Sequence, residues 1–209
     1  MPKIRPAVPL QYSPSQGVNM SKFSRIILIA IFSFIALLTS GCGPNQDIIE
    51  EDAIYRYLLN DFSSPTKPII VIKENTKVHL LQGRTLNSLF TPGKTLTQDV
   101  IDDFVAKNEK SYSLRTDMDL GHDYVLLKEN DLAEFFNGDQ NGWEVFREHY
   151  PESFGFFSFS RVGFNKDHTI ALVYYSHHFS NEGAFGAYYV LKKESGNWVL
   201  KDCPISWKD

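Results

Sequence analysis

The sequence lacks the short motifs that identify most enzyme families. It contains no G-x-S-x-G turn, no H-E-x-x-H pair, no glycine-rich phosphate loop and no paired cysteine and histidine signature. These absences point to no catalytic residue and to no cofactor, so we expect neither. A non-catalytic protein is the favoured hypothesis, and an enzyme is the alternative.

Cysteine is equally scarce, because Cys42 and Cys203 are the only two in 209 residues. If Cys42 is modified, Cys203 has no partner within the chain and an internal disulfide cannot form. Cys203 stands in an apolar stretch with Val199, Ile205 and Trp207. A lone thiol in such a stretch behaves as a small apolar side chain, so we expect Cys203 to be buried.

Acidic residues are missing from the first 41 positions, whose only charged side chains are Lys3, Arg5, Lys22 and Arg25. Taking these four from the 21 basic residues leaves 17, against all 25 acidic ones, which gives the rest of the chain a net charge of −8. Such an acidic body is repelled by nucleic acid and by anionic lipid headgroups. We therefore expect no nucleic-acid partner and no electrostatic attachment to a membrane.

A short apolar segment follows Met20, which is the favoured start of the protein. Ile26–Leu38 is an uncharged apolar run of 13 residues, shorter than the roughly 20 that a membrane-spanning helix needs. The small residues Thr39–Gly41 come directly before Cys42. This order is typical of a secretory signal peptide, so residues 1–41 are interpreted as an N-terminal extension and a signal peptide.

The sequence Leu-Thr-Ser-Gly-Cys over residues 38–42 resembles the lipobox of bacterial lipoproteins, with Thr39 in place of the preferred leucine. The resemblance implies that Cys42 is acylated and becomes the mature N-terminus, so the membrane is the expected partner. Several acyl chains attach a protein stably where one would be marginal. Gly43 stands where an aspartate commonly retains such proteins in the inner membrane, and the family pattern therefore favours the outer membrane. The alternative is an ordinary cleaved signal peptide, or an uncleaved anchor, with Cys42 incidental.

The C-terminal part predicts four successive strands, rich in aromatic and β-branched residues: FGFFSFSRVGF, TIALVYYSHHF, GAYYVLKK and NWVLKDCPISW. Turn-forming residues separate them, and such short connections force neighbouring strands to run antiparallel. The stretch Ile170–Phe179 is apolar on both faces, which predicts a central strand covered on both sides.

The N-terminal part predicts helices and short strands. Apolar periodicity and capping residues indicate helices over 48–62, after Thr97, over 132–136 and over 143–150, and short strands over 69–72, 79–81 and 124–127. The expected fold class is α+β. It is a single domain of residues 48–209 after a tether over 42–47, with N-terminal helices covering one face of a four-stranded antiparallel meander.

Four residues near the predicted strand ends form the candidate ligand-binding set. Arg161 shares a strand face with Phe159, where an unpaired charge is costly. Its head reaches either solvent or a structural carboxylate, or it binds an anion with its guanidinium fork. The favoured interpretation of His177 is an ordinary surface or half-buried histidine. The alternative is that it joins Tyr175 and Glu182 in a binding site at the end of the sheet.

The segment between the third and fourth predicted helices resembles a calcium-binding loop. Asn137, Asp139 and Asn141 occupy positions one, three and five, and Glu148 occupies position twelve. Asparagine at position one and Glu144 at position eight depart from the pattern. We therefore expect an ordinary turn between two helices and no metal, with a calcium site as the alternative.

The stretches FSRVGFNKDHTIALVYYSHH and GAYYVLKKESGNWVL look like small uncharacterised bacterial exported proteins, over roughly Ile54–Trp207. That likeness implies no activity. The terminal Gly-x-Trp strand also resembles the curved sheets of NTF2-like proteins. We expect a lipid-anchored cell-envelope protein that binds an envelope protein or a small ligand, or has a structural role. The alternative is an envelope hydrolase or an NTF2-like small-ligand-binding domain with a pocket near Arg161, His177 and Glu182.

Overall fold

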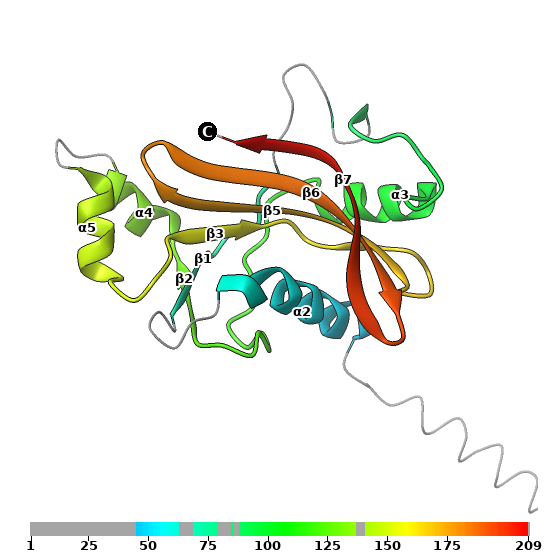
Figure 1. The fold of residues 1–209 in the computed structure, drawn as a ribbon, viewed down its shortest axis with the longest axis horizontal. Helices are drawn as coiled ribbons and strands as arrows, with labels where there is room; N and C mark the ends of the chain where they lie inside the picture. Colours follow the sequence, from blue (N-terminus) through cyan, green and yellow to red (C-terminus); the bar gives the residue numbers. More distant parts are fainter. Residues whose placement is uncertain (1–44, 63–68, 79–84, 86–87, 137–140, 209) are drawn as a thin grey trace, which may run out of the picture. The chain divides into compact units, whose positions relative to one another are not determined.

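The computed structural model describes residues 45–62, 69–78, 85, 88–136 and 141–208, and most of its elements are labelled in Figure 1. Along the chain they are α2 (Gln46–Leu59), η1 (Asn60–Phe62), β1 (Ile70–Lys73), α3 (Gln98–Lys107), β2 (Tyr124–Leu127), α4 (Glu129–Phe136), α5 (Gly142–His149), β3 (Phe156–Phe159), β4 (Gly163–Phe164), β5 (Ile170–Ser180), β6 (Gly183–Glu194) and β7 (Asn197–Lys208). The predicted α+β class is confirmed. Helix α2 begins at Gln46, within the predicted tether, and the predicted strand over 79–81 lies outside the described residues.

The sheet has seven strands, so the prediction of four was wrong. Its order is β2-β1-β3-β5-β6-β7, with β4 also paired to β5. The predicted antiparallel succession is confirmed from β3 to β7, but β2, β1 and β3 run parallel. Parallel strands are joined by long crossovers, and no local turn sequence signals their pairing. The first predicted strand is interrupted over 160–162 and forms both β3 and β4.

The hairpin between β6 and β7 shows how local sequence directs the antiparallel part. Ser195 and Gly196 form its two-residue loop, and both have positive φ, +50° and +85°. Two successive residues with positive φ match the twist of a β-hairpin, and glycine adopts this conformation without steric cost.

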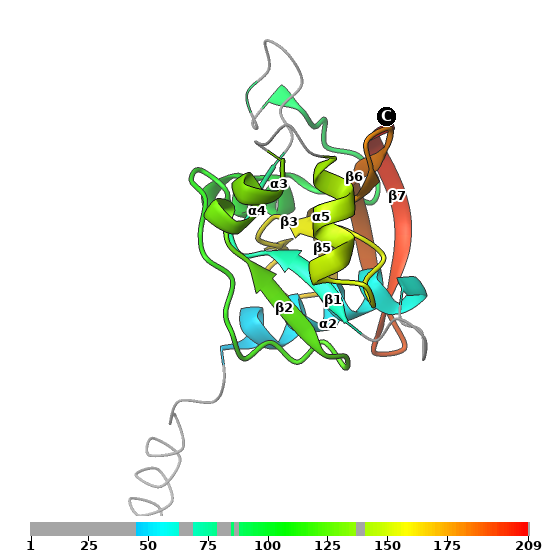
Figure 2. The same cartoon turned by 90° about the vertical axis from the view of Figure 1, so that its left-hand side faces the viewer.

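Helices cover both faces of the sheet, so the prediction of cover on one face was wrong. On β5, Ala171, Val173 and Tyr175 pack in the cluster of α2, while Leu172 and Tyr174 pack in the cluster of α3. Helices α4 and α5 pack on Val71 and Phe156, whose neighbours along each strand belong to the α2 cluster. Figure 1 shows α2 below β3 and β5, and Figure 2 shows α3, α4 and α5 above α2. The expectation of a central strand buried on both faces is confirmed for β5.

Strand β7 lies at the edge of the sheet, and its side chains are mostly exposed. Pro204, which has no amide hydrogen, is compatible with an edge position. Cys203 is exposed, so the expectation of a buried thiol was wrong. The apolar neighbours in sequence suggested a covered strand, but an edge position leaves the thiol facing solvent. No helix in the described part of the chain is both long enough and apolar enough to cross a membrane.

Gly163 provides a test of the packing between α3 and β4. A Cβ atom at Gly163 would lie 2.4 Å from Cβ and 2.5 Å from Cα of Phe104. We expect Gly163→Ala to lower the free energy of unfolding by about 1–3 kcal/mol, because the helix must move to relieve the overlap. Urea denaturation measures this. Gly93→Ala is the matched control, since a Cβ there meets nothing within 4 Å, and equal stability of the two variants would contradict the packing described.

Candidate functional site

Three consecutive acidic residues of α2, Glu50–Asp52, are buried and form ion pairs with three different parts of the chain. Glu50 pairs with Lys193 of β6, Glu51 with Arg161 at 2.8 Å, and Asp52 with Arg115 at 2.7 Å. Successive residues of a helix point about 100° apart. The three acidic side chains therefore point in three directions from α2. Through their ion pairs, α2 connects segments that lie far apart in sequence.

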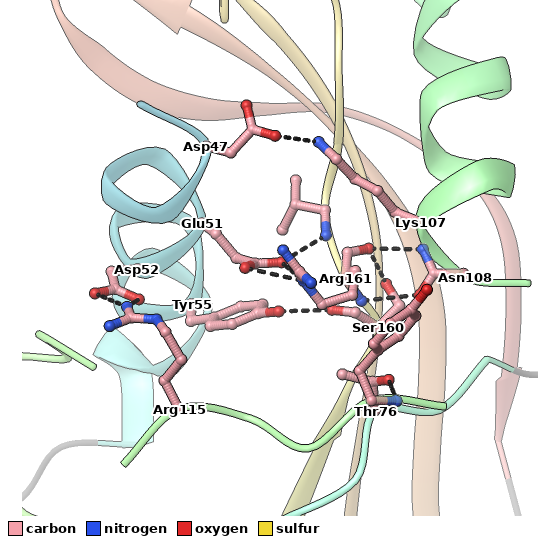
Figure 3. A network of polar contacts seen from close by, with 12 residues as sticks. Asp47, Glu51, Asp52, Tyr55, Thr76, Lys107, Asn108, Arg115, Ser160 and Arg161 are labelled. Carbon is pink, nitrogen blue, oxygen red and sulfur yellow. Dashed lines mark hydrogen bonds and ion pairs between the residues drawn. The ribbon is translucent and has the colours of Figure 1, made fainter. Parts of the chain in front are cut away.

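Arg161 belongs to this structural network, as Figure 3 shows. Its Nε donates to Glu51, which also accepts from the backbone N–H of Val162 at 2.9 Å. Asn108, at the end of α3, accepts from the Arg161 N–H and donates to its carbonyl, both at 2.9 Å. Burial alone would lower the pKa of Arg161, but the hydrogen bond and charge of Glu51 outweigh it and raise the pKa. The guanidinium is therefore held by a structural carboxylate, the first of the two interpretations of this residue.

The other three predicted ligand residues lie in different surroundings. Tyr175 is buried, and its hydroxyl has no hydrogen-bond partner within the described residues. His177 stacks on Phe157 at 4.3 Å, and its Nε2 lies 2.9 Å from the carbonyl oxygen of Phe154. Burial lowers the pKa of His177 and favours the neutral ring. Glu182 is exposed in the turn between β5 and β6.

The structure does not bring Arg161, His177 and Glu182 into one pocket. Ser160, next to Arg161, pairs with Tyr174 through its N–H, whereas the turn that carries Glu182 begins after Ser180. The seven residues of β5 from Tyr174 to Ser180 span roughly 20 Å, at about 3.3 Å for each step along the strand. Arg161 and Glu182 are therefore too far apart to act on one small ligand.

The predicted calcium loop is only partly described, since Asn137 and Asp139 lie outside the described residues. Asn141 caps α5, and its side chain accepts a hydrogen bond from the N–H of Trp143 at 3.2 Å. Glu148 is exposed on α5. Within the part of the chain that the structure describes, no group of three or more His, Cys, Asp or Glu residues is placed to hold a metal ion.

A cavity of about 560 Å³ lies between α2 and the β6–β7 hairpin, and we call it the α2 groove. Its walls are largely aromatic, from Tyr57, Phe62, Tyr175, Phe185, Tyr189 and Trp198. Several of its polar groups are already paired with the protein. Arg56 forms an ion pair with Asp119 at 2.6 Å, and the hydroxyl of Tyr57 accepts from the N–H of Leu200 at 3.2 Å.

A second cavity, of about 550 Å³, lies on the opposite face of the sheet, and we call it the Lys73 cavity. Its floor is formed by Lys73, Phe156, Ser158, His178 and Ala184 of four strands. Its wall is formed by Leu132, Ala133, Phe136 and Trp143 of α4 and α5, and its rim by Lys77, Glu129, Ser180 and Asn181. A concave site of this size with an aromatic wall and a few polar groups is typical of small-ligand sites.

One short side chain, Ser158, lies on the floor of this cavity. The strand register continues this row to Ser176 of β5 and Gly186 of β6, but these two residues lie outside the cavity lining, and Trp207 covers Gly186. The parallel register of β1 and β3, in which Ile72 pairs with Phe157, places Lys73 beside Ser158. Large side chains fill the sheet face on either side of this row, in the clusters of α3 and of α4–α5.

The polar groups of the Lys73 cavity differ in how firmly they are held. Lys73 Nζ lies 3.1 Å from Glu129 Oε2, and the two side chains are 11% and 64% exposed. The buried hydroxyl of Ser158 has no hydrogen-bond partner within the described residues. His178 stacks on Phe156 with 4.9 Å between ring centroids and an interplanar angle of 8°.

This arrangement is better suited to binding than to catalysis. A serine nucleophile requires a base within hydrogen-bonding distance. Ser158 makes no such bond in the structure, and Lys73 is engaged with Glu129. A buried hydroxyl and a nearly buried ammonium are, however, strong hydrogen-bond donors toward a ligand.

Comparison of the chain with protein-family models, with curated proteins and with solved structures finds no match. The site is therefore argued from its own residues. Sequence reasoning missed Lys73, Ser158 and Glu129. One signal was available: Lys73 shares a strand face with Val71 in a short apolar strand, where a lysine is unexpected.

The acidic run of α2 predicts a pH-dependent stability. Burial alone would raise the pKa of Glu50, but hydrogen bonds from Lys193 and Trp198 outweigh it and lower the pKa below its ordinary value. A carboxylate whose pKa is lower in the folded state stabilises the fold above its unfolded pKa, about 4.3, and this contribution disappears as the pH falls through the folded value. We expect Glu50→Gln to lower the free energy of unfolding by about 1–3 kcal/mol at pH 7, and by less below about pH 4.

Urea denaturation at pH 7 and pH 3 measures this difference. Glu134→Gln, at an exposed position of α4, is the control and should match the original protein at both pH values. A Glu50→Gln effect of the same size at both pH values would show that the carboxylate charge is not responsible.

Proposed function

We propose that this chain is a lipid-anchored bacterial cell-envelope protein whose folded domain binds a small ligand without chemical conversion. The observation that carries the binding part is the convergence of Lys73, Ser158 and His178 on one cavity with an aromatic wall. Polar groups that converge in a largely preformed apolar pocket are the usual composition of a ligand site.

The sequence before the domain supports the membrane anchor. A basic segment, an apolar run, small residues and Cys42 follow one another in the order of a lipoprotein signal. The net charge of −8 after position 41 offers no electrostatic attachment to anionic lipid. Acylation of Cys42 is therefore the attachment that we propose, with the outer membrane as the favoured location.

The alternative hydrolase or NTF2-like pocket near Arg161, His177 and Glu182 receives no support from the geometry. Arg161 is engaged with Glu51, His177 is packed among aromatic rings, and Glu182 lies in an exposed turn. Binding in the Lys73 cavity is therefore favoured over hydrolysis at those residues.

Acylation is tested at Cys42. Metabolic labelling with a palmitate analogue should label the protein, and Cys42→Ala should abolish the label, because the thiol accepts the acyl chain. Cys203→Ala is the control and should keep the label, since Cys203 does not follow a signal sequence. A Cys42→Ala variant that is labelled as strongly as the original protein would rule out the proposed anchor.

Ligand binding is tested with four probes that share a benzene ring: benzoate, phenyl phosphate, benzyl alcohol and benzylamine. Dissociation constants come from ligand-observed NMR on the full chain in detergent micelles, with protein-free micelles as the blank. We expect at least one probe to bind, and Ala133→Trp to weaken it roughly ten-fold or more, because indole fills the cavity.

Glu134→Trp is the matched control, since Glu134 is exposed on the same helix and does not line the cavity. It should bind like the original protein. If no probe binds, or if Ala133→Trp binds as well as Glu134→Trp, the proposed ligand site is wrong.

A further inference from the structure

The two side chains of the Lys73–Glu129 ion pair differ in their exposure to solvent, and this difference indicates which kind of ligand the cavity binds. The Lys73 side chain is 11% exposed and comes from β1 inside the sheet. The Glu129 side chain is 64% exposed and comes from the first residue of α4. The lysine is therefore held in the cavity, whereas the glutamate can turn toward solvent.

Separating the ion pair costs more free energy at Lys73 than at Glu129. An ammonium group with little access to water is costly to leave without an anionic partner. An exposed carboxylate regains water when it leaves, and exposed ion pairs contribute little to stability. Another anion that enters the cavity can therefore replace Glu129 on Lys73 at small cost.

Further donors of the cavity favour an anion as well. The buried hydroxyl of Ser158, next to Lys73 across the strands, has no protein partner in the described residues. Lys77 adds a second ammonium at the rim. Lysine and hydroxyl donors together suit carboxylate and phosphate oxygens, which accept several hydrogen bonds at once.

The wall of the cavity favours an aromatic ring on the same ligand. Trp143 and Phe156 stack at 5.6 Å with an interplanar angle of 9°, and Phe136 lies 5.1 Å from Trp143. Aromatic side chains attract a further ring in offset or edge-to-face contact. The cavity volume of about 550 Å³ is within the range of sites for small organic molecules.

We infer that the Lys73 cavity binds an aromatic organic anion, either a carboxylate or a phosphate ester. The anionic group replaces Glu129 as the partner of Lys73 and accepts from Ser158, while the ring packs against Phe136 and Trp143. Glu129 is thus an internal counter-ion that competes with the ligand. This inference rests on the proposed function, since it names the ligand class of the same cavity.

The four probes above differ in charge and therefore test the ligand class directly. We expect benzoate and phenyl phosphate to bind more tightly than benzyl alcohol and benzylamine. Lys73→Met should weaken the two anions roughly ten-fold or more, because it removes a charge-assisted hydrogen bond. Lys73→Arg keeps the charge and should retain measurable binding. Lys166→Met, in an exposed turn away from the cavity, is the control and should change nothing.

Glu129→Gln gives the sharper result, because a gain in affinity cannot come from misfolding. It should strengthen the binding of benzoate and phenyl phosphate about two- to five-fold, as expected when an exposed competing charge is removed. Glu134→Gln, an exposed glutamate of the same helix outside the cavity, should leave both affinities unchanged.

The outcomes separate this inference from the proposed function. One contrary result would be that benzyl alcohol or benzylamine binds as tightly as benzoate, with an affinity that Ala133→Trp weakens but Lys73→Met and Glu129→Gln leave unchanged. That result would show that the cavity is a ligand site and that the inferred anionic ligand class is wrong. If no probe binds, or if Ala133→Trp weakens the binding of none, both the proposed ligand site and the inferred anionic ligand class are wrong. A difference between benzoate and phenyl phosphate in the response to Lys73→Met would decide between carboxylate and phosphate.

Discussion

The buried ion pairs made by Glu50–Asp52 are the interactions on which the arrangement of this fold depends. They connect α2 with Lys193 on the β6–β7 hairpin, with Arg161 between β3 and β4, and with Arg115 after α3. The carboxylates are buried while their basic partners are 25–33% exposed, so removing one carboxylate is expected to cost about 1–3 kcal/mol, an appreciable part of the 5–15 kcal/mol that stabilises a typical domain. Each pair joins segments far apart in sequence, so together they determine how α2 lies on the sheet.

The opposite face of the sheet is organised differently, because two separate groups of helices cover it. Helix α3 packs on Tyr174 and Tyr188, while α4 and α5 pack on Val71 and Phe156. The Lys73 cavity opens beside α4 and α5, and the short side chains of Ser158 and Ala184 form part of its floor. A packed face with a local lack of side-chain volume produces a preformed pocket, and the charged and polar groups at its floor are then held at low exposure.

Several elements were predictable because their signals are local. The predicted strand over 124–127 coincides with β2, and the helix after Thr97 is α3, with Val100, Ile101 and Phe104 on its buried face. The pairing of β1 with both β2 and β3 was not predictable from turns. The same is true of the Glu51–Arg161 pair, which joins residues 110 positions apart. Arg161 drew attention as a charge among aromatic residues, but its partner could be identified only in three dimensions.

The sequence alone determined the features that depend on neighbouring residues: the apolar run ahead of Cys42, the helical periodicities and the hairpins of the C-terminal meander. Tertiary structure decided the parallel part of the sheet, the helices on both of its faces, the exposure of Cys203 and the Lys73 cavity. The cavity draws its lining from β1, β3, β5, β6, α4 and α5. Its position depends on strand register and helix packing, which are long-range interactions. The contact between Lys73 and Glu129, and the depression above Ser158, exist only once those strands and helices are assembled.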